Sequence, residues 1–172
     1  MTKGKQYHFL KLYEPIHDKF ERFCRARVYG RMDYRDLMNE SLLIAYQKFE
    51  HLRSEQAFFS FLIGISVRVL ANHHKKKKED SIEQLDRFDA GDVNANSETA
   101  TEIYLLHKAL ALLPDEQREC IILFEISGFS IKEIMDIQQA SEPAIKQRLK
   151  RGRDKLKALL TFESSNYKGG EK

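Results

Sequence analysis

The sequence predicts an all-α protein made of two small helical domains joined by an acidic flexible linker, with a helix-turn-helix in the C-terminal domain. Three observations support this fold class. Apolar residues recur at helical spacing in both halves. An acidic stretch rich in turn residues separates the halves, and the last helix is strongly basic. At 172 residues with 42% hydrophobic content, the chain can hold two small cores.

Three helices are expected in the N-terminal half, over residues 7–28, 33–49 and 57–78. The first has an apolar stripe and ends near Gly30, because glycine suits a helix C-terminus. The stripe consists of Leu12, Ile16, Phe20 and Phe23. On the second helix one face carries Leu37, Ser41, Ile44, Ala45 and Lys48, and another carries Asp36, Glu40, Leu43 and Gln47. The third faces a core with Phe58, Phe61, Leu62, Ile65 and Val69.

The middle of the chain is acidic and lacks sustained periodicity. From Glu79 to Glu102 there are eight acids and one base, a net charge of −7, whereas the whole chain is +3, so the remainder is +10. Turn-forming residues cluster in the stretch RFDAGDVNANSET. The sequence therefore predicts a domain over residues 1–80, a linker over 81–100, a domain over 101–162 and a flexible tail over 163–172.

Strong boundary residues delimit the helices of the C-terminal half. A helix over 101–113 is stopped by Pro114, and the next, over 115–127, is broken at Gly128. Ser130 then starts a Ser-x-x-Glu capping box with Glu133. After a turn near residues 138–140, Ser141 caps the last helix, and Pro143 falls in its first turn, where its missing N–H does no harm.

The last helix combines one apolar line with a dense set of cations. Ile145, Leu149, Leu156 and Leu160 recur on one face, and Gly152 lies on the same line. The basic residues are Lys146, Arg148, Lys150, Arg151, Arg153, Lys155 and Lys157. A helix that packs on a core while its other faces stay positive is typical of a recognition helix laid against DNA. Taken alone, it is also compatible with a solvated amphipathic helix at the end of a domain.

Several classes of function find no support in the sequence. No segment approaches the roughly 20 apolar residues of a membrane span, and the N-terminus lacks a secretory apolar core, so we expect a cytoplasmic location. Cys24 and Cys120 are expected to be buried free thiols. Neighbouring His73 and His74 point in different directions on a helix, so we expect no metal site and no cofactor. No catalytic constellation is visible, so we expect no enzyme.

With both halves laid out, the chain resembles a bacterial RNA polymerase sigma factor of the extracytoplasmic-function (ECF) group of the sigma-70 family. The stretch LLPDEQRECIILFEISGFSIKEIMDIQQASEPAIKQRLKRGRDKL resembles region 4, the reader of the −35 promoter element. The stretches DLMNESLLIAYQKF and AFFSFLIGISVRVLANHHKKKK resemble region 2, which binds polymerase and the −10 element. The resemblance covers nearly the whole chain outside the linker and the tail.

The resemblance implies a non-enzymatic transcription initiation factor. Its partners would be core RNA polymerase, through the β′ clamp and the β flap, and promoter DNA. Many members of the group are also held inactive by an anti-sigma factor. An exposed carboxylate face suits a protein partner better than DNA, which would repel it. In agreement with this, the resemblance places the polymerase-binding residues on the second helix: Asp36, Asn39, Glu40, Leu43 and Gln47.

For DNA, the resemblance implies two sets of residues. The −10 set combines a loop that captures a flipped base with the basic face of the third helix. It consists of Arg53, Ser54, Glu55, Gln56, Arg68, Asn72, Lys75 and Lys76. The −35 set lies on the last helix, where Gln147 can read adenine and arginine can read guanine. It consists of Ser141, Glu142, Ala144, Lys146, Gln147, Arg148, Lys150 and Arg151.

The chain departs from the family pattern at five positions that bear on promoter sequence. Phe61 replaces a usual Trp, Ser54 and Gln139 replace usual glycines, Arg68 replaces a usual Asn, and Ala144 replaces a common Thr. If position 139 requires a positive φ, Gln139 carries a modest cost there.

Three other interpretations stay open at this stage. A stand-alone helix-turn-helix regulator would explain the last helix but not the region 2 residues. An enzyme has the least support, and a protein that uses the sigma shape to occupy a regulator is the third. The net charge of −7 from Glu79 to Glu102 further suggests that the acidic linker mimics nucleic acid in a basic channel, in which case neutralising its acids should alter initiation.

Overall fold

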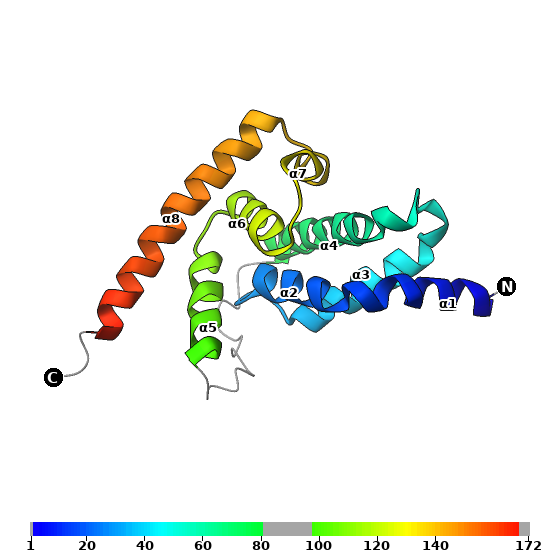
Figure 1. Cartoon of the computed structure of the whole chain (residues 1–172), viewed down its shortest axis with the longest axis horizontal. Coiled ribbons are helices and arrows are strands. Elements are labelled where there is room, and N and C mark those ends of the chain that lie inside the picture. The colour runs from blue at the N-terminus through cyan, green and yellow to red at the C-terminus, as the bar shows by residue number, and fades with distance from the viewer. Residues whose placement is uncertain (1, 81–97, 169–172) are drawn as a thin grey trace. The chain divides into compact units, whose positions relative to one another are not determined.

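The structure is a computed structural model that describes residues 2–80 and 98–168, and all regular structure in these ranges is helical (Figure 1). The chain divides into two compact units. Unit 1 comprises Met1–Cys24 and Met32–Arg87, and unit 2 comprises Arg25–Arg31 and Phe88–Lys172. Most of the expected acidic linker, residues 81–97, lies outside the described residues. None of the described helices is long and apolar enough to cross a membrane.

Unit 1 begins with two helices where the sequence led us to expect one. Helix α1 spans Thr2–Tyr13, a short 3-10 turn η1 spans Glu14–Ile16, and α2 spans His17–Val28. The break has a local cause. Pro15 has no N–H for the helical ladder and its ring collides with the preceding turn. The expected single helix over residues 7–28 is therefore wrong in its middle, and it also starts five residues too late.

Helices α3 and α4 match their expected positions closely. Helix α3 spans Tyr34–Gln47, with the Asp33 carboxylate accepting a hydrogen bond from the Arg35 N–H at 2.8 Å as its N-cap. Two 3-10 turns follow, η2 over Phe49–His51 and η3 over Glu55–Ala57, and α4 spans Phe58–Asp80. Helices α3 and α4 pack side by side.

An aromatic cluster forms much of the unit 1 core. The Phe9 ring meets the rings of Phe49 and Phe58 edge-on, each at 5.3 Å between centroids. Tyr46 adds a third edge-on contact to Phe9 at 5.4 Å. Such pairs contribute about 0.5–1.5 kcal/mol each beyond the burial of their area. The cluster therefore ties α1 to α3, α4 and the loop between them.

Unit 2 contains a helical bundle that ends in the expected helix-turn-helix. Helix α5 spans Glu98–Ala111, α6 spans Asp115–Ile121, and a π-helical segment η4 spans Ile122–Ile126. Gly128, at φ 76°, then redirects the chain. Helix α7 spans Ile131–Gln138 and α8 spans Glu142–Lys168. Helix α8 packs against α5, α6 and α7.

The capping box predicted at the start of α7 is confirmed. The Ser130 hydroxyl accepts from the Glu133 N–H at 3.2 Å, and the Glu133 carboxylate accepts from the Ser130 N–H at 2.8 Å. The turn that follows contains Gln139 at φ 50° and ψ 51°. Position 139 is thus in the left-handed region, where a non-glycine residue carries a steric cost of about 1–2 kcal/mol.

The apolar line of α8 packs into unit 2 as expected. Ile145 and Leu149 are buried, and Gly152 lies against Ile121 of α6 so closely that a Cβ would approach Ile121 Cγ1 to 2.9 Å. Cys120 is buried beside α8, with its Sγ 3.8 Å from the Ile145 carbonyl oxygen. The expected burial of free Cys24 and Cys120 is confirmed.

Helix ends differ from the expected boundaries in two places. Helix α5 begins at Glu98, so residues 98–100, expected in the linker, are helical. Helix α8 continues to Lys168, so the expected tail over 163–172 is helical backbone in its first six residues. Both extensions follow from composition, since the added stretches contain no proline or glycine to end a helix.

The buried charged residues of unit 2 were not anticipated, and Arg118 is the most deeply buried of them. Arg118 of α6 is fully buried, and its Nη2 donates to the Ala26 carbonyl at 2.7 Å within the same unit. Burial, reinforced by the charges of Arg27 and Arg31, lowers the pKa of the Arg118 guanidinium to about 9. The guanidinium is therefore largely protonated at neutral pH.

Candidate nucleic-acid interface

The outer face of α3 presents every residue that the sequence assigned to polymerase binding. All five are exposed: Asp36, Asn39, Glu40, Leu43 and Gln47. Leu43 keeps 59% of its surface exposed among these polar side chains. The opposite face of α3 is fully buried at Leu37, Ser41 and Ala45. A rigid helix that presents carboxylates, amides and an exposed leucine has the chemical groups to contact a protein partner.

The loop between η2 and η3 forms one wall of an open groove of about 470 Å³. The residues assigned to base capture, Arg53, Ser54, Glu55 and Gln56, are all exposed, but only Ser54 and Glu55 line the groove. The opposite wall comes from α1, through Gly4, Lys5 and His8. His8 Nε2 lies 2.7 Å from Glu55 Oε1, so α1 holds the loop directly.

The residues of α1 in this groove were missed by sequence reasoning. They lie more than 40 positions from the loop, and no local pattern relates Lys5 or His8 to it. Lys5 reaches Glu50 at 3.4 Å, a second link from α1 to the same segment. Polar groups on two walls give the groove the means to contact a base edge and a phosphate.

Helix α4 places its candidate residues on one exposed face. Arg68, Asn72, Lys75 and Lys76 are exposed, whereas Leu62, Ile65 and Val69 are buried on the other side. The spacing of about four residues aligns Arg68, Asn72 and Lys76 along the helix. A row of exposed cations on a rigid helix can attract phosphates independently of base sequence.

Helix α8 presents most of its candidate residues to solvent. Its N-cap residue Ser141 accepts from the Ala144 N–H at 3.4 Å. Glu142, Lys146, Gln147, Lys150 and Arg151 are exposed, and Ala144 is half-buried. Lys146 Nζ contacts Glu142 Oε1 at 2.6 Å, and this hydrogen bond, together with the lysine charge, lowers the pKa of the Glu142 carboxyl. Two candidate base-reading side chains are therefore paired with each other.

Arg148 is placed differently from the other residues of the −35 set. Its side chain is only 21% exposed and turns toward α6 and α7. Its Nη1 donates to Gln138 Oε1 at 3.0 Å, and its Nη2 lies 2.9 Å from Glu116 Oε2. The helical repeat placed Arg148 among the exposed cations, but its partners on other helices direct it inward.

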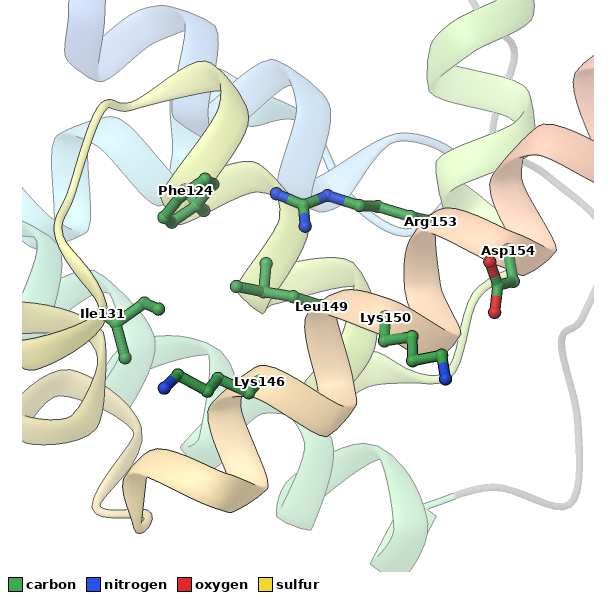
Figure 2. Close-up of a pocket in the computed structure, with 7 residues that line it drawn as sticks. All are labelled: Phe124, Ile131, Lys146, Leu149, Lys150, Arg153 and Asp154. Carbon is green, nitrogen blue, oxygen red and sulfur yellow. The ribbon is translucent and has the colours of Figure 1, made fainter.

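A groove of about 320 Å³ lies beside the basic surface of α8 (Figure 2). Phe124, Ile131 and Leu149 give it apolar walls, and Lys146 and Lys150 stand at its edge. Figure 2 shows the Arg153 side chain extended toward Phe124, and its guanidinium carbon lies 5.3 Å from the ring centroid. Arg153 also donates to Glu125 Oε1 from Nε at 2.8 Å and from Nη2 at 2.6 Å. Arg153 therefore braces α8 against the π-helical segment.

The described residues contain no group of three or more His, Cys, Asp or Glu side chains placed to hold a metal ion. The chemical groups on the exposed faces are cations, amides and carboxylates, which suit recognition of nucleic acid and protein.

Comparison with known proteins agrees with this geometry. The family described as sigma-70, region 4 matches residues 103–156, the segment that contains the helix-turn-helix. The ECF RNA polymerase sigma factor EcfG of Rhodopseudomonas palustris is 31% identical over 132 residues, covering 76% of this chain and 72% of its own length. The ECF RNA polymerase sigma factor SigM of Mycobacterium tuberculosis is 27% identical over 160 residues, covering 92% of this chain and 80% of its own.

Solved structures share the fold at lower sequence identity. The sigma factor RpoE of Bartonella quintana, crystallised with the anti-sigma factor NepR, has a TM-score of 0.68 and 22% identity, covering 94% of this chain and 98% of its own. The match to EcfG, which spans most of both chains, and the region 4 match over the helix-turn-helix together establish the family. The chain belongs to the ECF RNA polymerase sigma factors.

Proposed function

We propose that this sigma factor divides promoter reading between its two units. As a DNA-binding member of its family, it works with core RNA polymerase to direct promoter-specific transcription initiation. In the proposal, the outer face of α3 binds polymerase, the groove and α4 of unit 1 engage the −10 element, and α8 of unit 2 reads the −35 element. The chain itself carries no catalytic chemistry and acts in the cytoplasm, where polymerase works.

One observation carries the −35 assignment. Lys146, Gln147, Lys150 and Arg151 are exposed on the first turns of α8, immediately after the helix-turn-helix turn. The opposite side of the same turns is held in the core by Ile145 and Leu149. A recognition helix needs one exposed side and one buried side, because its base-reading side chains must be held at a fixed depth in the major groove.

The −10 assignment is supported by the unit 1 groove. It has a polar rim from Ser54 and Glu55 and lies next to the α1 cation Lys5. A groove of this composition can take an unstacked base from a single strand, with phosphate held nearby.

Regulation by a protein partner is part of the proposal. The RpoE structure contains the anti-sigma factor NepR, and another structure of similar fold shows CnrH with the cytosolic domain of CnrY, at a TM-score of 0.68. We extend this mode of control to the present chain, for which an anti-sigma factor would compete with polymerase or DNA.

The test is a promoter selection with purified components. Core RNA polymerase is mixed with the chain, transcribed sequences are recovered from a random library, and the selection is repeated with two variants. Gln147→Ala should relax the preference at one −35 position, because a good bidentate base contact gives about 1–3 kcal/mol of discrimination. Lys150→Ala should leave the selected sequence unchanged and weaken binding to all promoters.

Lys11→Ala, at an exposed cation on α1, serves as the matched control and should behave as wild type. If core polymerase with the wild-type chain recovers no common −35 and −10 sequences, the proposed division of promoter reading is wrong. If Lys150→Ala changes the selected sequence and Gln147→Ala does not, then Lys150 and not Gln147 reads the base.

A further inference from the structure

Gln138 is the centre of a hydrogen-bond network that joins three helices of unit 2. Its Nε2 donates to the Glu116 carbonyl oxygen at 3.2 Å and to Glu119 Oε1 at 3.1 Å, both on α6. Its Oε1 accepts from Arg148 Nη1 at 3.0 Å, which brings in α8. Gln138 is itself the last residue of α7. One amide therefore connects the first helix of the helix-turn-helix, the recognition helix and the supporting helix α6.

Arg148 closes this network with its second nitrogen. Arg148 Nη2 lies 2.9 Å from Glu116 Oε2, so the two ends of the guanidinium contact two different helices. A planar guanidinium can do this because its donors point in fixed, diverging directions, whereas a lysine ammonium offers a single centre.

The position of the network along the chain makes it relevant to DNA reading. Gln138 directly precedes Gln139, the one described non-glycine residue with a positive φ, at 50°. The turn around Gln139 sets the angle between α7 and α8. Because a left-handed glutamine is strained, contacts outside the turn must help to hold this angle.

We infer that Arg148 and Gln138 form a clamp that positions the recognition helix, and that Arg148 is a positioning residue and not a DNA contact. This inference rests on the proposed role of α8 at the −35 element. It assigns the exposed Lys146, Gln147, Lys150 and Arg151 to DNA, and it removes Arg148 from that set. It also makes Gln138 and Glu116, which the sequence did not single out, determinants of promoter affinity.

The salt dependence of binding separates a positioning residue from a phosphate contact. Each phosphate contact contributes about 0.9 to the slope of log K against log salt concentration. The experiment measures binding of polymerase holoenzyme to the promoter selected with the wild-type chain, at several salt concentrations. Arg148→Ala should weaken binding about tenfold with an unchanged slope. The matched variant Arg151→Ala, on the exposed side of the same helix, should weaken binding and lower the slope by about 1.

Two further variants guard against simple unfolding. Gln138→Met keeps the length of the side chain without its hydrogen bonds, and Arg148→Lys keeps the charge without the forked donors. Each should weaken binding at constant slope. The double variant Gln138→Met/Arg148→Ala should lose less affinity than the sum of the two single losses, because the two residues share one hydrogen bond. Circular dichroism of each full-length variant checks that the helices are intact.

The outcomes are distinguishable from failure of the proposed function. If Arg148→Ala lowers the salt slope as Arg151→Ala does, Arg148 contacts phosphate and the clamp is wrong. Additive losses for Gln138→Met and Arg148→Ala would likewise contradict the clamp, even if the −35 assignment stands. If neither Arg148→Ala nor Arg151→Ala affects promoter binding, the assignment of α8 to the −35 element itself fails.

Discussion

Glu40 on α3 and His73 on α4 form a hydrogen-bonded pair, with 2.8 Å between Glu40 Oε2 and His73 Nε2. Both side chains are about half exposed. Glu40 belongs to the proposed polymerase-binding surface, and His73 follows Asn72 on the helix proposed to engage the −10 element. The pair therefore restricts the rotamer of a carboxylate that polymerase would contact.

Removal of His73 should weaken polymerase binding modestly. An exposed pair of this kind contributes about 0–1 kcal/mol, so His73→Ala should raise the Kd for core polymerase about two- to fivefold. Glu40→Ala removes the carboxylate itself and should raise the Kd more than tenfold. The measurement is a fluorescence titration of labelled chain with core polymerase.

The matched control is His17→Ala, because His17 forms a similar exposed pair with Glu21 on α2 at 3.4 Å. This control should bind polymerase as wild type does. An unchanged Kd for Glu40→Ala would mean that Glu40 does not belong to the polymerase-binding surface. A His73→Ala loss as large as that of Glu40→Ala would mean that His73 contacts polymerase itself.

Two helical glycines, Gly64 of α4 and Gly152 of α8, should respond to alanine in opposite directions. A Cβ at Gly64 would meet no atom within 4 Å, so Gly64→Ala should raise the free energy of unfolding by about 0.5–1 kcal/mol through helix propensity. A Cβ at Gly152 would lie 2.9 Å from Ile121 Cγ1. Overpacking of this kind costs about 1–3 kcal/mol, which exceeds the propensity gain, so Gly152→Ala should destabilise the chain.

Urea denaturation followed by circular dichroism gives both values under the same conditions. Each variant is the control for the other, since the substitution is identical and only the surroundings differ. Stabilisation by Gly152→Ala would show that α8 can move away from Ile121 without cost. This result would contradict the close packing of α6 on α8.

Most of the buried face of α3 could be predicted from sequence, although Lys48, placed on that face, is exposed and Met38 is buried. The direction of Arg148 could not be predicted. Leu37, Ser41 and Ala45 repeat at helical spacing, and a local period is enough to identify a buried face. Arg148 shares its helix with exposed cations, and its orientation depends on Gln138 and Glu116, which lie on other helices. A single sequence contains no record of such partners, because tertiary contacts and not periodicity select the rotamer.

The contrast between local sequence patterns and tertiary contacts also applies to the other residues for which prediction and structure can be compared. The left-handed turn at Gln139 could be suspected, since the resemblance implied a glycine at this position, and the structure has the positive φ. The contribution of His8 to the unit 1 groove depends on a contact 47 positions away and has no local pattern. The break at Pro15 could have been predicted, because proline inside a helical pattern is a known interruption, but the apolar stripe outweighed it.

Replacement of Gln139 by glycine should stabilise the chain. The left-handed conformation costs a non-glycine residue about 1–2 kcal/mol, and glycine adopts it freely. Part of the gain is offset because the Gln139 side chain donates to the Asp136 carbonyl at 2.6 Å. We expect Gln139→Gly to raise the free energy of unfolding by about 0.5–1 kcal/mol, as measured by the urea midpoint.

Lys155→Gly, at an exposed position of α8 in the right-handed region, is the control and should lower stability by about 0.7–1 kcal/mol. Equal losses for the two variants would mean that residue 139 is not left-handed in solution. The promoter affinity of Gln139→Gly should stay close to wild type if the clamp around Gln138 holds the turn.

Titration of Cys120 should make stability fall at alkaline pH. Burial raises the pKa of the Cys120 thiol from 9.0 to about 11 in the folded chain. The unfolded chain therefore loses this proton first as the pH rises. The stability that the thiol contributes is complete below pH 9 and is lost progressively toward pH 11, by about 1–2 kcal/mol.

Cys120→Ala isolates this contribution from other groups that titrate in the same range, such as Tyr13, whose pKa burial raises to about 12. Unfolding free energies of both chains are measured by urea denaturation at several pH values between 8 and 11, with reductant present. Wild type should lose more stability over this range than Cys120→Ala does, even though the variant starts lower because of the small cavity it leaves. Parallel pH profiles would mean that the Cys120 thiol is as accessible in the folded chain as in the unfolded one, which would contradict its burial between α6 and α8.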